Sequence, residues 1–456
     1  MDTLEPPTNE VSKKSGGLKK LILGLLAFGM FTLIILAGAV YLAFGYIRSS
    51  IESTSFTIPI LADKPVKNHI AFVGNDNNLW LVTPNGDDLR QITEDGRGYR
   101  FPTWAPDGRR LAFIGPGGST RSALYVSPTN SSHPVVIYNQ PGSAPFYLYW
   151  APDSNSITFL TQDRSGMAMR QVNTAIPDES RTLGEGAPFY WAWSPQSDKV
   201  LMHVGGARAV SKEAHISILE NQAEAQRVEL DLAPGRFQAP VWSSDGNYFF
   251  YIAANDQADE SIYKTNAQTL EQTTVTDLDR FAFLVLSPDN RHLAYLQLER
   301  GVPSPFGTAY LIDTDGNNRR RLTDDIVASM YWSPDGKKLA LLTLKTSVDG
   351  STAQKVQGLA APLPQEIQLR WWIYNVETEE LEPLISFPPT QAFLQTVPYF
   401  DQYHLSLTFW SPDSRYFVVT KGNNDEKGGS VWVVDTTGKE DPLKVGEGTL
   451  AVWSWQ

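Results

Sequence analysis

The sequence predicts an all-β fold: an eight-bladed β-propeller closed by the C-terminal strand and preceded by one N-terminal transmembrane helix. A seven-bladed ring is the alternative. Three observations carry the prediction: a motif of the form W-S-P-D-G occurs seven times, most copies are about 45 residues apart, and one uncharged stretch of 27 residues lies near the N-terminus. A period near 45 with several short strands per unit is typical of propeller blades.

The first element is the uncharged stretch, residues 21–47, which is long enough to cross a hydrocarbon core of about 30 Å as a helix. A cleaved signal peptide is the alternative, because Ala37-Gly38-Ala39 offers a cleavage site. However, the apolar part of a signal peptide usually has only about 7 to 15 residues. The sequence therefore favours an uncleaved anchor, preceded by a disordered tail at 1–20 and followed by a tether at 48–67.

The charges beside the predicted helix indicate its orientation. Lys13, Lys14, Lys19 and Lys20 precede it, whereas Arg48 alone follows closely. Because positive flanks stay in the cytoplasm, we expect a single-pass protein of the cytoplasmic membrane with its N-terminus inside. The propeller at 68–456 is then extracytoplasmic.

The repeated motif predicts a hairpin turn between the first two strands of each blade. In Pro334-Asp335-Gly336, Pro sets φ at the second turn position and Gly takes the left-handed position that closes the turn. The Trp before the turn ends one strand, and the apolar run after it begins the next. The copies are WAPDGRRLAFI from Trp104, WAPDSNSITFL from Trp150, WSPQSDKVLM from Trp193, WSSDGNYFFYI from Trp242, LSPDNRHLAYL from Leu286, YWSPDGKKLALLTL at 331–344 and WSPDSRYFVVT from Trp410.

The two ends of the array complement each other. Residues 69–93 contain a second strand, HIAFV, with a third and a fourth, but no W-S-P-D-G motif precedes them. Residues 448–456 contain a first strand and then stop. We therefore expect the C-terminal strand to complete the first blade, which removes an open sheet edge. The blade-start Trp residues are expected to pack between neighbouring sheets.

Charge and motifs exclude several classes of function. From residue 51 onward there are 33 basic and 47 acidic residues, a net charge of -14, and such a surface repels nucleic acids. No hydrolase, zinc-protease, phosphate-binding or dinucleotide-binding motif is present. Asp313 to Gly316 resembles part of a calcium loop, but the turns at 84–87 and 435–438 occupy the same place in their blades. The sequence predicts no enzyme, no catalytic residue, no metal site and no cofactor. We expect structural or surface roles for the scattered histidines His69, His133, His203, His215, His292 and His404.

One step in the array is irregular and suggests a partner-binding surface. The step of 78 residues before Trp410 carries two insertions, 345–370 and 386–404. Both leave the face of the ring opposite the W-S-P-D-G turns, because successive strands alternate in direction. Long loops often bind partners, but rings can equally hold a loop against the adjacent blade. The candidate partner-binding residues are Phe387, Phe393, Tyr399, Phe400 and Tyr403.

The repeat W-[SA]-P-D-[GS], followed by an apolar strand and an R-x-L-T ending, resembles the TolB-type β-propeller repeat over residues 69–456. It is also similar to the repeats in the propeller domains of the prolyl-oligopeptidase and dipeptidyl-peptidase families. The resemblance implies an extracytoplasmic propeller that binds proteins or peptides. TolB itself has six blades and an extra N-terminal domain, so its particular partners are not implied.

Three functions are compatible with these observations. The anchor, the closed ring and the missing catalytic motifs favour a protein-interaction scaffold or accessory subunit of an envelope complex, with protein partners. A peptide- or glycan-binding module that uses the channel or the insertion face is the second. A hydrolase with a channel site is the third.

Overall fold

The structure is a computed structural model that describes residues 65–118, 120–163, 166–177, 179–206, 213–222, 226–254, 259–299, 304–345, 368–423 and 428–456. These residues belong to the compact unit Pro59–Gln456. The predicted tail, the predicted transmembrane helix at 21–47 and all of the tether except 65–67 lie outside the described residues. Within the described ranges, no helix is long and apolar enough to cross a membrane.

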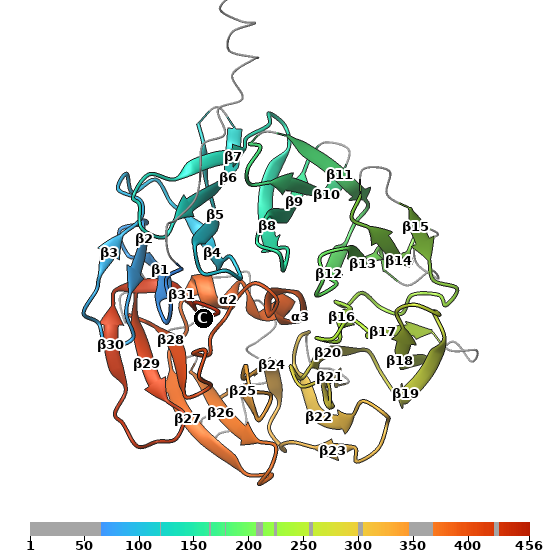
Figure 1. The fold of residues 1–456 in the computed structure, drawn as a ribbon. Helices are drawn as coiled ribbons and strands as arrows, with labels where there is room; N and C mark the ends of the chain where they lie inside the picture. Colours follow the sequence, from blue (N-terminus) through green and yellow to red (C-terminus); the bar gives the residue numbers. More distant parts are fainter. Residues whose placement is uncertain are drawn as a thin grey trace, which may run out of the picture. The chain divides into compact units, whose positions relative to one another are not determined.

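The unit is built from antiparallel sheets arranged around a common centre (Figure 1). Each sheet follows the chain from an inner to an outer strand, as the alternation of turns and apolar runs predicts. Four sheets contain four consecutive strands each. The first two are β4(Arg100–Trp104), β5(Arg110–Gly117), β6(Thr120–Pro128) and β7(Val135–Tyr138), and then β8(Ala144–Trp150), β9(Ser156–Gln162), β10(Met167–Asn173) and β11(Ser180–Glu185). The other two are β12(Phe189–Trp193), β13(Lys199–Val204), β14(His215–Glu220) and β15(Arg227–Glu229), and then β16(Val241–Trp242), β17(Tyr248–Ala254), β18(Glu260–Asn266) and β19(Gln272–Leu278).

The next strands form one eight-stranded sheet, in which two sets of four are joined through Gly307 and Val327. The first set is β20(Ala282–Leu286), β21(His292–Leu298), β22(Gly307–Asp313) and β23(Arg320–Arg321), and the second is β24(Val327–Trp332), β25(Lys338–Leu344), β26(Leu369–Asn375) and β27(Leu381–Phe387). A further sheet contains β28(Tyr416–Gly422), β29(Gly429–Asp435) and β30(Leu443–Gly446). Trp410 pairs with Phe417 in the place of its first strand.

The C-terminal strand completes the first sheet, as predicted. β31(Gly448–Trp453) pairs antiparallel with β1(Ile70–Gly74), which continues to β2(Leu79–Val82) and β3(Arg90–Gln91). In the register Phe72 lies opposite Ala451. The first and the last strand of the described residues therefore meet within one sheet, and the predicted closure is confirmed.

The W-S-P-D-G motifs form the predicted turns between first and second strands. Gly336 has φ of +70°, a left-handed conformation that favours glycine. Ser154 and Ser414 take the same conformation, and each accepts a hydrogen bond through Oγ from the turn of the preceding sheet. The amide of Asp107 donates to Ser154 at 3.0 Å, and that of Asp335 donates to Ser414 at 3.1 Å. The turn motif therefore also connects neighbouring sheets.

The Trp residues at the ends of first strands connect the inner strands, as predicted. Their indoles pack between sheets, and most donate Nε1–H to a carbonyl of the preceding first strand. Because an indole that is buried without a partner is costly, these bonds stabilise the contact between sheets. The pairs are Trp104 to Val452, Trp150 to Thr103, Trp242 to Ala192, Trp332 to Val285 and Trp410 to Tyr331.

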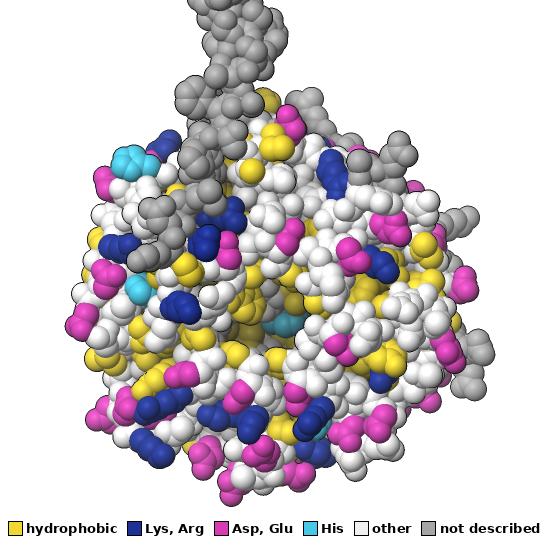
Figure 2. Space-filling view, viewed as in Figure 1, with side chains coloured by type: hydrophobic (Ala, Val, Ile, Leu, Met, Phe, Trp, Pro, Cys, Tyr) yellow, Lys and Arg dark blue, Asp and Glu magenta, His cyan; other side chains and the backbone are white. Residues whose placement is uncertain are grey.

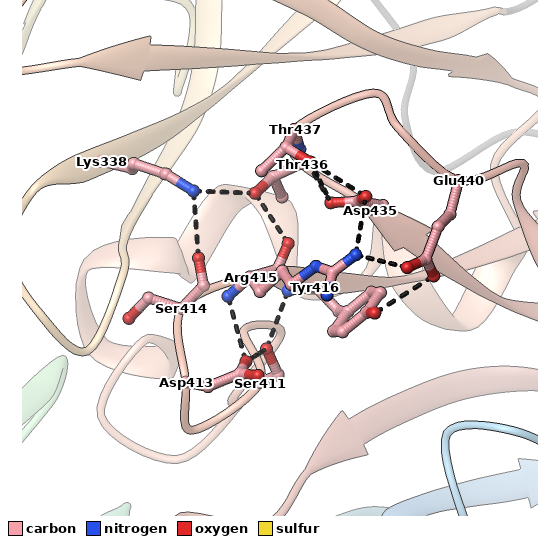
Figure 3. A network of polar contacts seen from close by, with 10 residues as sticks. All are labelled: Lys338, Ser411, Asp413, Ser414, Arg415, Tyr416, Asp435, Thr436, Thr437 and Glu440. Atoms are coloured by element: carbon pink, nitrogen blue, oxygen red, sulfur yellow. Dashed lines mark hydrogen bonds and ion pairs between the residues drawn. The ribbon is translucent and has the colours of Figure 1, made fainter.

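A polar network joins the last two sheets at the turn face (Figure 3). Lys338 of β25 donates through Nζ to the carbonyl of Ser414 at 3.2 Å and to Oγ1 of Thr436 at 3.0 Å. Arg415 lies in the same network and contacts the carboxylates of Asp435 and Glu440. Lys338 thus connects two sheets, whereas Arg415 acts within one.

Candidate functional site

The second insertion does not stay at the edge of the ring but enters its centre. We call residues 388–408 the plug; it contains α2(Gln391–Leu394), η2(Val397–Tyr399) and α3(Phe400–Tyr403). Figure 1 shows α2 and α3 among the inner strands. The plug starts beside β28, where Pro389 pairs with Lys421, and Thr390 caps α2 by accepting from the amide of Phe393.

Backbone and side-chain hydrogen bonds fasten the plug to several inner strands. Gln402 accepts from the amide of Trp191 at 2.9 Å and donates to its carbonyl at 3.0 Å. Further along, the carbonyl of Ser406 accepts from Oγ1 of Thr103 at 3.0 Å. β4 and β12 are the innermost strands of their sheets, so no further strand pairs with their inner edges. The plug supplies hydrogen-bond partners to polar groups at these edges instead.

Four of the five predicted partner-binding residues are buried. Phe387, Phe393, Phe400 and Tyr403 lie in the interior, and Tyr399 is 48% exposed. The rings pack against the walls of the channel: Tyr403 lies 4.6 Å from Tyr147, Phe400 lies 5.5 Å from Phe283, and Phe393 lies 6.1 Å from Trp371, between ring centroids. Of the five, only Tyr399 is available at the surface for a partner.

The predicted position of residues 386–404 on the face opposite the turns is therefore correct only for the start of the insertion. The last residues reach the turn face, where His404 and Leu405 line a surface hollow. The apolar rings of the plug and of the inner strands cover each other, which removes more apolar surface from water than a loop on the rim would. The first insertion lies mostly outside the described residues.

The hollow is an apolar cavity of about 520 Å³ at the centre of the turn face. Figure 2 shows apolar side chains around the depression. Prolines from several W-S-P-D-G turns form its rim, aromatic residues form its wall, and the end of the plug forms its floor. The lining residues are Pro106, Tyr149, Trp150, Pro152, Leu286, Pro288, Tyr331, Trp332, Pro334, His404, Leu405, Leu407, Thr408, Phe409, Trp410, Pro412, Ser454 and Trp455.

A smaller cavity of about 330 Å³ adjoins the hollow and shares Tyr149, Pro152 and His404 with it. None of the described residues that line the two cavities is Asp, Glu, Lys or Arg. Burial lowers the pKa of His404 to about 4, so the imidazole is neutral at pH 7. The hollow therefore offers apolar and neutral polar contacts and no charge.

The plug also contains a buried carboxylate in α3. Asp401 accepts a hydrogen bond from the amide of Ala239 through Oδ2 at 2.7 Å, while its Oδ1 has no partner among the described residues. Burial raises the pKa of Asp401 to about 7, and the hydrogen bonds from backbone amides, including that of Ala239, partly oppose the rise. Tyr190 and Tyr331 also lie close enough to interact electrostatically with it.

The described residues contain no group of His, Asp or Glu side chains that could hold a metal ion. Proline rings, indoles and aliphatic side chains bind extended apolar peptide segments through shape and burial.

Sequence reasoning did not identify the hollow, although a signal for it was present. Seven W-S-P-D-G turns leave one face of a closed ring, so their prolines must converge there. The sequence gives a weaker indication of where the plug lies. The apolar residues among 393–403 indicate that this segment is buried, but they do not indicate which surface covers it.

The sequence matches no protein-family model and none of the curated proteins. Among solved structures, TolB from Acinetobacter baumannii is 16% identical, covers 55% of this chain and 62% of its own, and has a TM-score of 0.36. The match thus spans less than two thirds of that protein. An oligogalacturonate lyase from Vibrio parahaemolyticus is 14% identical over 84% of this chain and 85% of its own, with a TM-score of 0.44.

The dihydro-heme d1 dehydrogenase NirN is 12% identical over 87% of this chain and 78% of its own, with a TM-score of 0.57. At such identities the likeness is one of fold alone. TolB and prolyl endopeptidases are among the structures found, in agreement with the resemblance of the repeat. The likeness in fold rests on NirN, whose TM-score is above 0.5, whereas the matches to TolB and to the prolyl endopeptidases have TM-scores of 0.36 and 0.47.

Proposed function

We propose that this chain is a protein-binding module of the cell envelope, and that its hollow binds an uncharged, apolar segment of a partner protein. The observation that carries the proposal is the hollow itself, an apolar cavity of about 520 Å³ without a charged lining residue. Trp455 lines it and is 42% exposed, so part of the apolar lining is accessible from the surface. Apolar surface of this kind marks binding sites.

The proposal includes eight blades and a membrane anchor. The eight-blade count treats the eight-stranded sheet as two blades and Trp410 as the first strand of the β28 sheet. The uncharged residues 21–47 and the four lysines before them support a single-pass anchor with the propeller outside the cytoplasmic membrane. A subunit of an envelope complex fits both features.

The position of the propeller has its own test. The chain contains no cysteine, so a single introduced cysteine reports one site. A membrane-impermeant maleimide applied to intact cells or spheroplasts should label Thr269→Cys, on an exposed turn, and spare Lys13→Cys. The reverse pattern would refute the orientation.

The absence of catalysis is also part of the proposal. Enzymes such as oligogalacturonate lyase are among the structures of similar fold, as is TolB. The support comes from the lining residues, which offer no activated nucleophile and no pair of carboxylates. Hydrolysis of a peptide or glycan by the purified chain, lost on substitution of a lining residue, would contradict it.

Binding at the hollow is tested with a photo-reactive phenylalanine at Pro334, on its rim, in native membranes. We expect an adduct whose partner peptide is apolar and uncharged. Leu405→Glu should abolish the adduct, because it places a charge on the floor, whereas Leu405→Met should preserve it. An adduct unaffected by Leu405→Glu would overturn the assignment of the hollow.

Tyr399 supports a second candidate surface. It lies on η2 and remains exposed, unlike the other four predicted residues. The same photo-reactive residue at position 399 compares the two surfaces directly: adducts from position 399 and none from position 334 would favour the insertion face.

A further inference from the structure

The hollow and the smaller cavity beside it meet at a common wall. Six residues line both cavities, and two of them carry polar side chains: Tyr149, Pro152, Leu286, Pro288, His404 and Leu405. Tyr149 belongs to β8, and His404 is the C-cap of α3 in the plug. Figure 2 shows a histidine, in cyan, within the depression, and His404 is the histidine that lines it. Two polar side chains thus face the junction of two largely apolar cavities.

The polar atoms at the junction are free to bind a ligand. The hydroxyl of Tyr149 and Nε2 of His404 form no hydrogen bond with the described residues, and neither is an enclosed atom as Nδ1 of His404 is. The carbonyls of Phe400 and Asp401 approach the imidazole from the preceding turn, and Nδ1 is the ring nitrogen closer to the backbone. A lone pair on Nδ1 would face these oxygens, so the proton of the neutral ring is assigned to Nδ1. Nε2 is then an acceptor, and the hydroxyl of Tyr149 is a donor.

Polar side chains elsewhere in the two linings are paired within the protein. Ser243 and Ser287 donate through Oγ to aspartates of their own turns. The indoles of Trp332 and Trp455 donate to backbone carbonyls. The hydroxyl of Tyr331 has no partner among the described residues, but it is an enclosed atom. The acceptor and the donor at the junction are therefore the groups that a ligand must satisfy.

A donor beside an acceptor matches one residue of an extended chain. In such a chain the N–H and the C=O of a residue point to the same side. Gln402 of the plug already binds the N–H and C=O of Trp191 in this way. Side chains two positions apart lie on one face, about 7 Å from each other. One of them can therefore enter each cavity while the residue between them lies at the junction.

We propose that Tyr149 and His404 select the segment that the hollow binds: an extended, uncharged segment with two apolar side chains separated by one residue. The N–H of the middle residue donates to Nε2 of His404, and its C=O accepts from the hydroxyl of Tyr149. The inference rests on the proposed function, since it concerns the same site, and adds the basis of recognition. A charged side chain would find no opposite charge among the described residues that line the two cavities. An apolar ligand without an amide would leave the two polar groups unpaired.

The middle N–H is tested with two synthetic probes. One is acetyl-Leu-Ala-Leu-amide, and the other is the depsipeptide in which lactate replaces Ala, so that an ester oxygen replaces the middle N–H. Their affinities for the full-length protein are measured by ligand-observed NMR. We expect the depsipeptide to bind at least about five-fold more weakly, because Nε2 of His404 then lacks a donor. Equal affinities would overturn the proposal.

Substitutions assign the preference to the two side chains. His404→Leu should weaken the peptide by about five-fold and leave the depsipeptide unchanged, because the lost acceptor and the lost N–H belong to one hydrogen bond. His404→Gln keeps an acceptor and should restore part of the preference. Tyr149→Phe should weaken both probes, since both retain the middle C=O. His133→Leu, on an exposed turn, is the control and should change neither.

A preference for the peptide that survives His404→Leu contradicts the assignment of the acceptor. If His404→Leu does not fold, Tyr149→Phe decides alone, and unchanged affinities in that variant contradict the proposal.

The probes and the adduct from position 334 separate this inference from the proposed function. If both probes bind equally and Leu405→Glu removes both, the hollow binds apolar segments but does not recognise the amide, so only this inference fails. The same holds if neither probe binds while the adduct still depends on Leu405. If neither probe binds and no adduct depends on Leu405, both proposals fail. If the peptide is preferred and no adduct depends on Leu405, recognition of the amide stands and the partner function fails.

Discussion

Gln402 pairs with Trp191 as a residue of a neighbouring β-strand would. The amide of Trp191 donates to Oε1 of Gln402 at 2.9 Å, and Nε2 of Gln402 donates back to the carbonyl of Trp191 at 3.0 Å. Both residues are buried, so no solvent competes for these groups. One side chain of the plug therefore replaces the missing strand beside the inner edge of β12.

This pairing predicts a large effect from a substitution that conserves volume. Gln402→Leu leaves the buried N–H and C=O of Trp191 without partners, and each such group costs about 1–3 kcal/mol. We expect the free energy of unfolding, measured by urea titration, to fall by about 2–5 kcal/mol. Gln395→Leu is the matched control, because Gln395 is exposed on the same plug. Similar losses in the two variants would show that the pairing contributes little.

Asp401 predicts a pH dependence of stability. Its pKa is about 7 in the fold against an ordinary value of 3.8, because burial disfavours the charged form. Between these values the unfolded chain releases the proton while the folded chain retains it. Stability from this group is therefore complete below about pH 4 and decreases as the pH rises to about 7, by at most about 1.4 kcal/mol per pH unit.

Asp401→Asn isolates this contribution. The Asn carbonyl can still accept from the amide of Ala239, and the side chain no longer ionises. We expect the variant and the unchanged chain to be similarly stable near pH 4 and the variant to be more stable at pH 8, by chemical denaturation. Burial lowers the pKa of His203 and of His404 to about 4, which makes stability rise with pH in the same window, so only the difference between the two chains is informative. A difference that does not vary with pH would refute the argument.

The hydrogen bonds of Lys338 predict that its side chain contributes more to stability than the side chain of Lys337. Its Nζ bonds to Ser414 and Thr436 in the next sheet, whereas Lys337 forms an exposed pair with Glu377. Lys338→Ala should lower the free energy of unfolding by about 1–2 kcal/mol, because charged donors form the stronger hydrogen bonds. Lys337→Ala should change it by less than about 1 kcal/mol. Equal changes, measured by thermal unfolding, would mean that the bonds between sheets add nothing.

Local features of the sequence predicted most of the fold. The left-handed position of Gly336 follows from its place in the turn motif, and the pairing of β1 with β31 follows from a missing and an extra strand. Both are consequences of a repeat whose units are all built alike, so each unit predicts the next. Trp410, too, packs where the other blade-start residues pack.

The central features could not be predicted in the same way. The rings of the plug indicate burial, but the repeat does not say that the channel is wide enough to hold them. Nothing local distinguishes Asp401 from the many exposed acidic residues, since only its position among inner strands buries it. The hollow depends on both features, because the plug forms its floor and the turns form its rim. The convergence of the turns on one face of the ring therefore implied where the hollow lies, whereas the repeat did not imply how deep the hollow is.

The final strand predicts unequal effects for two tryptophans that are two positions apart. Trp453 is completely buried in β31 and donates through Nε1 to Oδ1 of Asn68 at 2.8 Å, while Trp455 is partly exposed at the hollow. Trp453→Ala should cost about 3–5 kcal/mol of stability, because it leaves a cavity where the first sheet closes. Trp455→Ala should cost about 1 kcal/mol, the loss of one hydrogen bond and part of an apolar contact. If the two substitutions lower the free energy of unfolding equally in urea, closure of the first sheet is not what stabilises the ring. If Trp455→Ala alone reduces the adduct formed by a photo-reactive phenylalanine at Pro334, the two residues separate stability from recognition.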